Sequence, residues 1–511
     1  MAELLLYVAP EFLLILVASA LYVAATWVGS WRGWPWCACG CVLLAAVMLA
    51  AVGTLAGPES AAEAATVSVA FDRLALSLRW LALATGFAIV LLAIDRARSA
   101  TAGEYFASLL LLTAGLSLAC TANDLILLFA SLELISLPTY VLLYLGKREL
   151  EAREAAAKYF YLSVLASALF LFGVALSYGL TGATNLRAMH ETLLQPELQA
   201  AAVPSLGALA VGLILGGVSF KMAAVPFHFY AGDVYQGTTN VMAAALSWFP
   251  KVAGAIAALR LLVYALPVLD RQGAWLAWVF AVATMTLGNT MALLQTNVRR
   301  LMAFSGVAHA GYMLVALGAG CLQGPPGTLF LGTESLVLYL IAYALMTIGF
   351  FAVIIVLSDG ERPCETIEDF AGLAQRAPLL AALSTVLLLS LIGLPFTLGF
   401  WAKVSVFYAA IATRDVRYVV LAVIGLVNAA IGAFYYLRIV AYIYLRSGYT
   451  QPRIRFSSPS FLVAVVCAIL TLALGLWPAP AAAVAHASGA WAEGQLEARL
   501  PQASPFQPIE R

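Results

Sequence analysis

Long apolar runs separated by short polar segments fill the chain up to about residue 480. A helix needs about 20 apolar residues to cross the roughly 30 Å hydrocarbon core of a bilayer. Such runs predict helices because a backbone in lipid must satisfy its own hydrogen bonds. The pattern predicts about fourteen spans, near residues 6–28, 36–56, 74–94, 104–122, 124–145, 155–179, 204–228, 240–264, 275–295, 300–320, 330–357, 379–408, 416–445 and 460–480.

Composition places most of the chain in lipid rather than in water. Of the 511 residues, 63% are hydrophobic and 10% are charged, whereas soluble domains carry roughly 25% charged residues. The net charge of +1 suggests no nucleic-acid partner. Residues 1–12 lack a basic region and a small-residue cleavage site, so we expect the first helix to be a retained span. The fold class is therefore an all-α integral membrane protein.

The polar pieces between the spans are too short to form a soluble domain. The longest are residues 57–73, 180–203 and the Pro- and Ala-rich tail 481–511. We therefore expect a single membrane domain over 1–511, with a tail that has no fixed position unless it packs on a partner. The loops on one side of the membrane carry roughly 14 Lys and Arg residues, and those on the other side carry roughly 8. The heavier side, which includes Lys147, Arg148, Arg453 and Arg455, is expected to be cytoplasmic, with both termini periplasmic.

Four ionisable residues lie deep inside predicted spans: Glu133, Lys221, Lys251 and Lys403. A charge at the centre of a spanning helix costs about 2.5–3.5 kcal/mol on insertion scales, so such residues face the bundle interior or a wet cavity and mark ion pathways. A structural ion pair is the simpler alternative for Glu133, and a lysine that reaches the interface is the alternative for Lys221. Pairing and proton handling are compatible, because a change in pairing changes which group holds the proton.

Two of the predicted helices are expected to be broken. Pro226 follows Lys221 and removes a helical hydrogen bond, which frees the carbonyl of Met222. Gly393, Pro395 and Gly399 interrupt the 30-residue run that holds Lys403. Broken helices at membrane depth line polar cavities, and paired broken helices in two halves of a chain indicate a transporter built from repeats.

Other polar residues within the spans have less certain roles. His228 and His309 can exchange protons near neutral pH, so each is a candidate relay, although a lone histidine in a helix is often only structural. Arg79 and Arg438 keep their protons and are interpreted as structural counter-charges. The seven cysteines, which include Cys37, Cys39 and Cys41, lack metal-ligand spacing and are interpreted as packing residues.

No motif for redox or hydrolytic chemistry is present in the sequence. There is no Walker loop, no GxGxxG after a strand, no cysteine set spaced for an iron–sulfur cluster and no haem ligand pair. We therefore expect no cofactor bound by this chain. The energy for ion movement must come from an ion gradient or from partner subunits.

Four blocks, in order, resemble the antiporter-like membrane subunits of respiratory complex I: LLFASLELISLPTYVLLYL, FKMAAVPFHFYAGDVYQGTTNVMAAALSWFPKVAG, MTLGNTMALLQTNVRRLMAFSGVAHAGYML and the segment from Gly372 to LPFTLGFWAK. The similarity runs over nearly the whole chain and is weakest in the first 100 residues. Lysines at both 251 and 403 favour the subunit N branch, the counterpart of mitochondrial ND subunit two. Leu394-Pro395-Phe396 departs from the usual double-proline pattern of the family at the second break.

The resemblance implies fourteen helices with two inverted five-helix repeats, with helices 7 and 12 discontinuous. On this sequence it divides the chain into an N-terminal three-helix segment, 1–100, a first repeat, 104–264, a second repeat, 275–445, and a last helix, 460–480. It implies a glutamate on helix 5 and lysines on helices 7, 8 and 12, which fall on Glu133, Lys221, Lys251 and Lys403.

The function implied is proton translocation in a bacterial NADH:quinone oxidoreductase of the inner membrane. NADH, FMN, iron–sulfur clusters and quinone are then expected in partner subunits, with subunit M and a small K-type subunit as membrane neighbours and the peripheral redox arm linked indirectly. Three alternatives remain open: a subunit of a cation/proton antiporter, a subunit of a hydrogenase- or ferredoxin-linked complex, and a structural spacer with static ion pairs.

Overall fold

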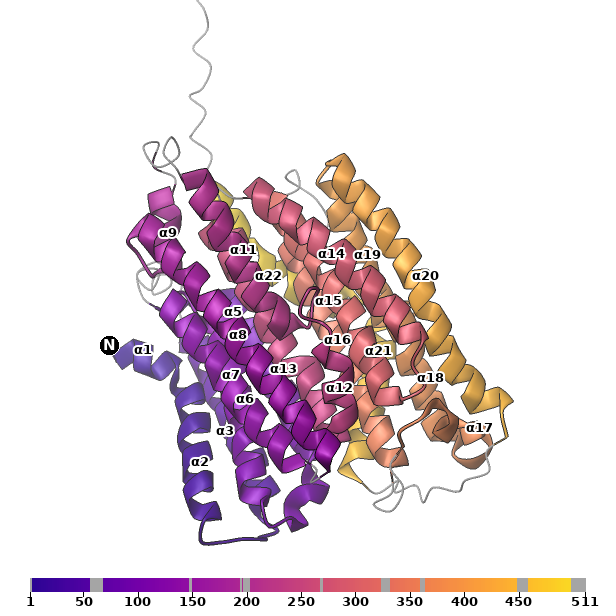
Figure 1. The fold of residues 1–511 in the computed structure, drawn as a ribbon. Coiled ribbons are helices and arrows are strands. Elements are labelled where there is room, and N and C mark those ends of the chain that lie inside the picture. Colours follow the sequence, from indigo (N-terminus) through magenta and orange to yellow (C-terminus); the bar gives the residue numbers. More distant parts are fainter. Residues whose placement is uncertain are drawn as a thin grey trace, which may run out of the picture.

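The computed structural model describes residues 2–55, 68–146, 149–193, 195, 203–266, 270–322, 331–358, 364–447 and 458–497. Helices fill most of these ranges and run roughly parallel to one another as one tilted bundle (Figure 1). Lys147, Arg148, Arg453 and Arg455, which entered the prediction of orientation, lie outside the described residues, as does the tail beyond Glu497.

The helices coincide closely with the apolar windows of the sequence. Eleven described helices are long and apolar enough to cross a membrane, and four shorter apolar helices account for the remaining windows. The unbroken helices are α2 (Ala9–Ala25), α3 (Trp34–Leu55), α5 (Arg73–Leu92), α6 (Ala102–Thr121), α7 (Leu125–Gly146), α8 (Leu150–Thr181), α14 (Asp270–Leu293), α15 (Val298–Leu322), α16 (Gly332–Leu357), α20 (Val416–Leu445) and α21 (Pro459–Leu476). The membrane class is confirmed, whereas the count of fourteen and the two inverted repeats stay predictions.

Both predicted helix breaks are present. Helix α11 (Val203–Met222) ends one residue after Lys221, and the chain continues through non-helical residues to α12 (Tyr230–Gly237). Helix α18 (Pro378–Ile392) ends at Gly393, whose φ of +87° a residue with a side chain rarely adopts. Helix α19 (Leu398–Ala412) then carries Lys403 back toward the break.

A third irregularity was not predicted. Helix α13 (Asn240–Ala258), which carries Lys251, continues into a π-helical segment, Leu259–Ala265. Short π-helical turns often occur at functional sites. Here the segment contains the buried Arg260, whose guanidinium lies 3.4 Å from the carboxylate of Asp72, the N-cap residue of α5. The end of the Lys251 helix is thus held by the N-terminal part of the chain.

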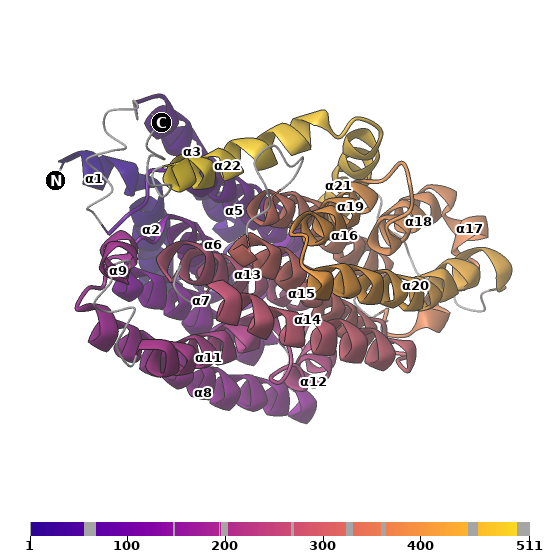
Figure 2. The same ribbon diagram turned by 90° about the horizontal axis from the view of Figure 1, so that it is seen from above.

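The prediction of a tail without fixed position is wrong for its first part. Residues Ala479–Glu497 form a helix, α22, which extends from beside α21 toward α5 (Figure 2) and packs against α16 and α5. The imidazole Nδ1 of His486 lies 3.0 Å from the carboxylate of Glu334 at the start of α16. Ala481 and Ala485 are buried, so small side chains one turn apart give α22 a face that packs closely on the bundle.

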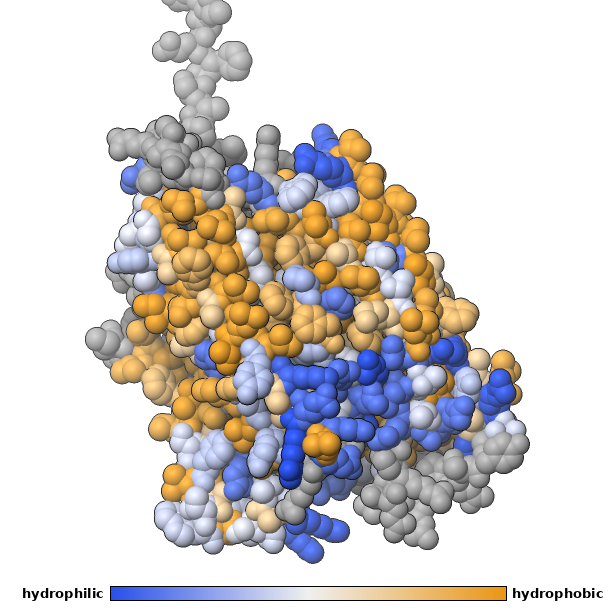
Figure 3. Space-filling model, in the orientation of Figure 1, coloured by the Kyte–Doolittle hydropathy of each residue, from blue (hydrophilic) through white to orange (hydrophobic). Residues whose placement is uncertain are grey.

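The surface separates into apolar and polar zones. Orange hydrophobic residues form a broad band across the bundle, and blue hydrophilic residues gather below it around α12 and the lower ends of its neighbours (Figure 3). Inside the bundle, Arg79 and Glu11 form a fully buried pair with two contacts of 2.9 and 2.8 Å. This confirms the prediction that Arg79 is a counter-charge. Arg438 differs, because its guanidinium donates to backbone carbonyls at the end of α14, including that of Leu293.

Candidate functional site

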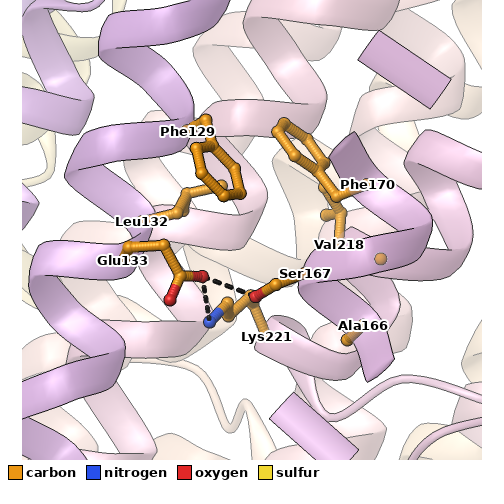
Figure 4. A pocket seen from close by; sticks show the side chains of 9 residues that line it. Phe129, Leu132, Glu133, Ala166, Ser167, Phe170, Val218 and Lys221 are labelled. Carbon is orange, nitrogen blue, oxygen red and sulfur yellow. Dashed lines mark hydrogen bonds and ion pairs between the residues drawn. The ribbon is translucent and has the colours of Figure 1, made fainter. Parts of the chain in front are cut away.

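Glu133 and Lys221 meet between α7 and α11. Their charged atoms are 4.0 Å apart, and Ser167 also contacts the carboxylate of Glu133 (Figure 4). Ser167 of α8 donates to the carboxylate of Glu133. The Lys221 ammonium donates to Ser136 and, at 3.3 Å, to Ser163. Because serine hydroxyls both donate and accept, this cluster can hold a proton on either side of the pair.

Glu133 is less buried than the sequence suggested. Its side chain is 27% exposed, whereas that of Lys221 is 5% exposed. Next to the pair is a cavity of about 10 Å³, lined partly by Phe129 and Phe170 (Figure 4). That volume is about the minimum that holds one water molecule. The carboxylate of Glu133 is therefore partly accessible from the surface of the chain.

Lys251 lies at the centre of the bundle. It is 1% exposed, and its ammonium donates to the backbone carbonyl of Gly306 on α15 and, at 3.4 Å, to the hydroxyl of Tyr343 on α16. A side chain at position 306 would collide with the ammonium, since an added Cβ would lie 2.6 Å from Nζ. Glycine at 306 thus makes the close approach of lysine and backbone possible.

His309 lies one turn beyond Gly306, among buried tyrosines. Its Nδ1 atom is 2.6 Å from the hydroxyl of Tyr339, and its Nε2 atom is 3.2 Å from the hydroxyl of Tyr436, which also bonds to Ser305. The ring of Tyr343 lies 5.2 Å from the imidazole. Tyr343, which contacts Lys251, therefore also packs on His309.

Lys403 lies at the second break. Its ammonium donates to the carbonyls of Leu391 and Ile392, at 3.0 and 2.7 Å, which the end of α18 leaves without helical partners. It also lies 5.2 Å from the ring centre of Tyr312, which packs against His309 at 6.0 Å. The break predicted from Gly393 and Pro395 thus supplies the ligands of the lysine.

The structure brings some of the predicted residues together and leaves others apart. Glu133 and Lys221 form one cluster, and Lys251, His309 and Lys403 belong to a second, tyrosine-rich cluster. The two approach each other at Gly254, where an added Cβ would lie 3.0 Å from Cβ of Lys221. Among the described residues, no hydrogen bond joins Lys221 to Lys251.

His228 is not part of either cluster. It lies in the segment between α11 and α12, and its buried Nδ1 atom has no hydrogen-bond partner within the part of the chain that the structure describes. No group of three or more histidine, cysteine, aspartate or glutamate side chains could hold a metal ion among the described residues. The relay predicted for His228 therefore stays a prediction, without a contact to a lysine.

A polar pocket below the first break was missed in the sequence. Asp233 of α12 binds Lys158 of α8 at 2.8 Å and Arg300 of α15 at 2.7 Å, and Glu154 pairs with Lys158 at 2.7 Å. These four residues line a pocket of about 210 Å³. Asp233 and Arg300 stand within largely apolar blocks, which could have indicated a polar site. Both lie near the ends of predicted spans, however, where charged residues are common.

Three aromatic rings pack together beside this pocket and Lys221. The rings of Tyr159, Phe220 and Tyr230 pack with centroid distances of 5.3, 5.5 and 4.6 Å. Tyr159 follows Lys158 on α8, and Phe220 precedes Lys221 on α11. The hydroxyl of Tyr230 donates to the carbonyl of Phe220 at 2.9 Å, which ties α12 to the last turn of α11.

Comparison with known proteins identifies the family. Residues 122–432 match the family described as NADH:quinone oxidoreductase/Mrp antiporter, transmembrane. The curated protein NADH-quinone oxidoreductase subunit N of Trichlorobacter lovleyi is 38% identical over 377 residues, covering 74% of each chain. The chain belongs to the subunit N family. Subunit N 2 of Roseiflexus castenholzii is likewise 38% identical, over 449 residues that cover 86% of this chain and 87% of that protein.

Solved structures share the fold over nearly the full length. A chain of respiratory complex I from Thermus thermophilus is 30% identical, with a TM-score of 0.76 and coverage of 92% of this chain and 97% of that one. A chain of the archaeal membrane-bound sulfane sulfur reductase has a TM-score of 0.80, and one of the Mrp complex from Dietzia has 0.75, each at 22% identity. These last two show the fold alone. The family match over residues 122–432 includes Glu133, the three buried lysines and His309.

Proposed function

We propose that this chain is a proton-translocating, non-redox membrane subunit of a bacterial NADH:quinone oxidoreductase. The observation that carries the proposal is the second cluster, in which Lys251, Tyr343, His309 and Tyr436 follow one another through buried contacts. Such residues are costly in a membrane interior and mark ion pathways. The names of the subunit N relatives support the assignment to this enzyme.

In the proposed mechanism, a conformational or electrostatic change in partner subunits reaches Glu133 first. Its partial exposure suits contact with a neighbouring subunit. A change in pairing between Glu133 and Lys221 moves a proton toward Lys251, with bridging water between the two clusters. The proton then passes by way of His309 and the tyrosines to Lys403.

The required change in proton affinity is modest. Moving one charge against 100 mV costs about 2.3 kcal/mol, which corresponds to a roughly 50-fold change in the proton affinity of a carrier. Forming or breaking contact with one opposite charge supplies a change of that order. The pocket at Asp233 and Lys158 is the proposed site of proton uptake, and the ring of Tyr159 its barrier.

The partners and location follow from the same assignment. Subunits of the M and K types would be the neighbours of this chain in the membrane. NADH, FMN, iron–sulfur clusters and quinone would be bound by other subunits of the complex. The more basic side would face the cytoplasm of a bacterium, with both termini in the periplasm.

The deciding experiment is proton pumping by the purified complex in vesicles. Lys251→Met should lower the number of protons pumped per NADH oxidised, while Arg187→Met, at an exposed ion pair on α9 (Leu186–Leu193), should not. Lys251→Arg serves as a second variant, because arginine keeps the charge but does not release its proton. Unchanged pumping in both Lys251 variants would leave only a structural role.

Identification of the companion subunits separates the alternatives. Flavin- and iron–sulfur-containing subunits that oxidise NADH are expected to co-purify with the chain. Nickel–iron or ferredoxin-binding companions would instead assign it to a related complex. Sodium/proton exchange in membranes without NADH and quinone would assign it to an antiporter.

A further inference from the structure

A second polar pocket lies far from the lysine clusters, at the end of the bundle where α19 ends and α20 begins. It has a volume of about 510 Å³, within the range of small-molecule sites. Its polar lining includes Thr413, Arg414, Asp415 and Arg417, and its aromatic lining comes from Trp275 and Trp278 of α14 and Tyr418 of α20. Nothing in the proposed proton pathway uses this pocket.

We propose that this pocket binds the head group of an anionic phospholipid. Arg414 and Arg417 supply guanidinium groups, which match phosphate geometry with two parallel hydrogen bonds. Arg414 is exposed, and its guanidinium has no hydrogen-bond or ion-pair partner among the described residues, while its backbone N–H donates to the carbonyl of Ile411. With one carboxylate, that of Asp415, the lining carries a net charge of +1, so it favours an anion.

The carboxylate of Asp415 is already engaged. It caps α20 by accepting a hydrogen bond of 2.8 Å from the backbone N–H of Arg417, and it lies 3.5 Å from the Nε atom of the same residue. Arg417 is nevertheless 67% exposed, so its other nitrogens are open to a ligand. Asp415 orients this arginine without neutralising the second one.

Arg414 occupies a backbone conformation that suits glycine. Its φ is +58°, in the left-handed region, directly after the end of α19. A residue with a side chain is strained there by about 1–2 kcal/mol. Glycine or asparagine usually takes this position after a helix. The chain therefore tolerates strain to place a cation at the rim of the pocket.

The frame of the pocket is fixed by contacts between α14 and α20. The indole of Trp278 donates to the carbonyl of Arg417, and the hydroxyl of Tyr418 donates to the carbonyl of Ala274, each at 2.8 Å. Trp275 is 51% exposed beside them. Tryptophan is enriched at membrane–water interfaces, where the head groups of lipids lie.

The apolar surface next to the pocket selects a lipid over free phosphate. Figure 3 shows hydrophilic residues at the upper end of α20 and an apolar surface directly below them. The exposed aliphatic side chains of α20 that follow the pocket in the sequence are Val416, Val419, Val420, Val423, Leu426 and Val427. A phospholipid places its phosphate on the arginines and its acyl chains along these residues. Inorganic phosphate would leave them uncovered.

The test uses the purified complex that contains this chain, depleted of lipid in detergent and given a photoactivatable phosphatidylglycerol. We expect labelling of peptides containing Trp275–Trp278 or Thr413–Tyr418. The variant Arg414→Ala/Arg417→Ala should weaken binding roughly 10- to 30-fold, because each basic residue near a membrane surface contributes to anionic lipid binding. The matched control, Arg73→Ala, removes an exposed arginine on α5 and should bind as the parent does.

Arg414→Gly separates binding from folding. It relieves the strained conformation, so the lipid-depleted complex should melt at the same or a higher temperature, yet lipid labelling should fall. Three results would overturn the proposal. They are equal labelling by phosphatidylcholine, displacement of the lipid by excess inorganic phosphate, and cross-linking of this surface to a companion subunit in place of lipid.

Discussion

The Nδ1 atom of His309 lies 2.6 Å from the hydroxyl of Tyr339, which joins α15 to α16 in the region between Lys251 and Lys403. Lys251 reaches the same region through Tyr343, and Lys403 reaches it through Tyr312. Both nitrogens of the imidazole have tyrosine neighbours. An imidazole, which can both accept and donate a proton, is thus connected on two sides, as a relay requires.

Removing one of these hydroxyls should interrupt proton transfer. Tyr436→Phe deletes the group next to Nε2 of His309 and also its bond to Ser305. Loss of one hydrogen bond to a charged group amounts to about 1.5 kcal/mol, or roughly tenfold in rate. We expect proton pumping in vesicles to fall by that order, while NADH oxidation with an artificial electron acceptor is retained.

Tyr418→Phe is the matched control for that experiment. Tyr418 is equally buried, but its hydroxyl bonds to the carbonyl of Ala274, away from the lysines. Equal losses of pumping in the two variants would mean that the effect comes from packing rather than from the relay.

Opening the aromatic barrier should allow protons to leak. Tyr159→Ala removes the ring that packs on Phe220 and Tyr230 between the pocket at Asp233 and Lys221. Water in the resulting space would connect the pocket with the lysine. We expect a faster decay of an imposed pH gradient in vesicles that contain the complex.

Phe160→Ala provides the comparison, since Phe160 is the next residue on α8 and is 43% exposed. It should leave the gradient at its normal lifetime. Because truncating a large buried side chain can cost about 3–5 kcal/mol, the amount of assembled complex is measured for both variants. A gradient that survives equally in Tyr159→Ala argues against the barrier.

The buried pair of Asp72 and Arg260 should be important for stability. Removing one partner of a buried ion pair leaves an unpaired charge and costs about 3–5 kcal/mol. Arg260 also donates to the carbonyl of Cys120, and Asp72 caps α5, so three helical elements depend on this contact. Asp72→Asn is expected to lower the melting temperature of the complex.

The exposed pair of Arg187 and Glu191 is a suitable comparison. Glu191→Gln should change stability by no more than about 1 kcal/mol, because exposed pairs contribute little. If Asp72→Asn is as mild as Glu191→Gln in thermal unfolding, the pair does not hold the end of the Lys251 helix.

Close packing at the second break should make Gly399 irreplaceable. An added Cβ would lie 1.9 Å from the carbonyl oxygen of Ser390, so α18 and α19 would have to separate. Overpacking of this kind costs roughly 1–3 kcal/mol. Because Lys403 depends on carbonyls at the end of α18, Gly399→Ala should reduce both stability and pumping.

Gly40 is the comparison position, because a side chain there would have free space. It lies within α3, and an added Cβ would meet nothing within 4 Å. Alanine is favoured over glycine in helices by up to about 1 kcal/mol, so Gly40→Ala should be neutral or stabilising in thermal unfolding. A loss of stability at Gly40 equal to that at Gly399 would contradict the packing argument.

The sequence alone determined where the helices are and where two of them break. The predicted window 416–445 coincides with α20, and the break after Lys221 follows from Pro226, because both depend on local rules. A membrane requires about 20 apolar residues for a span, and proline removes a hydrogen bond wherever it lies in a helix. The placement of the four ionisable residues within helices could be predicted in the same way.

Only the tertiary structure decided which residues meet. His309 contacts Tyr436, 127 residues away, whereas His228 contacts no lysine among the described residues. Arg260 pairs with Asp72 across 188 residues. The pattern along one helix fixes depth in the membrane, but in lipid every helix is apolar on most of its faces. The rotation of each helix, and therefore its contacts, is set by packing against neighbours that are distant in sequence.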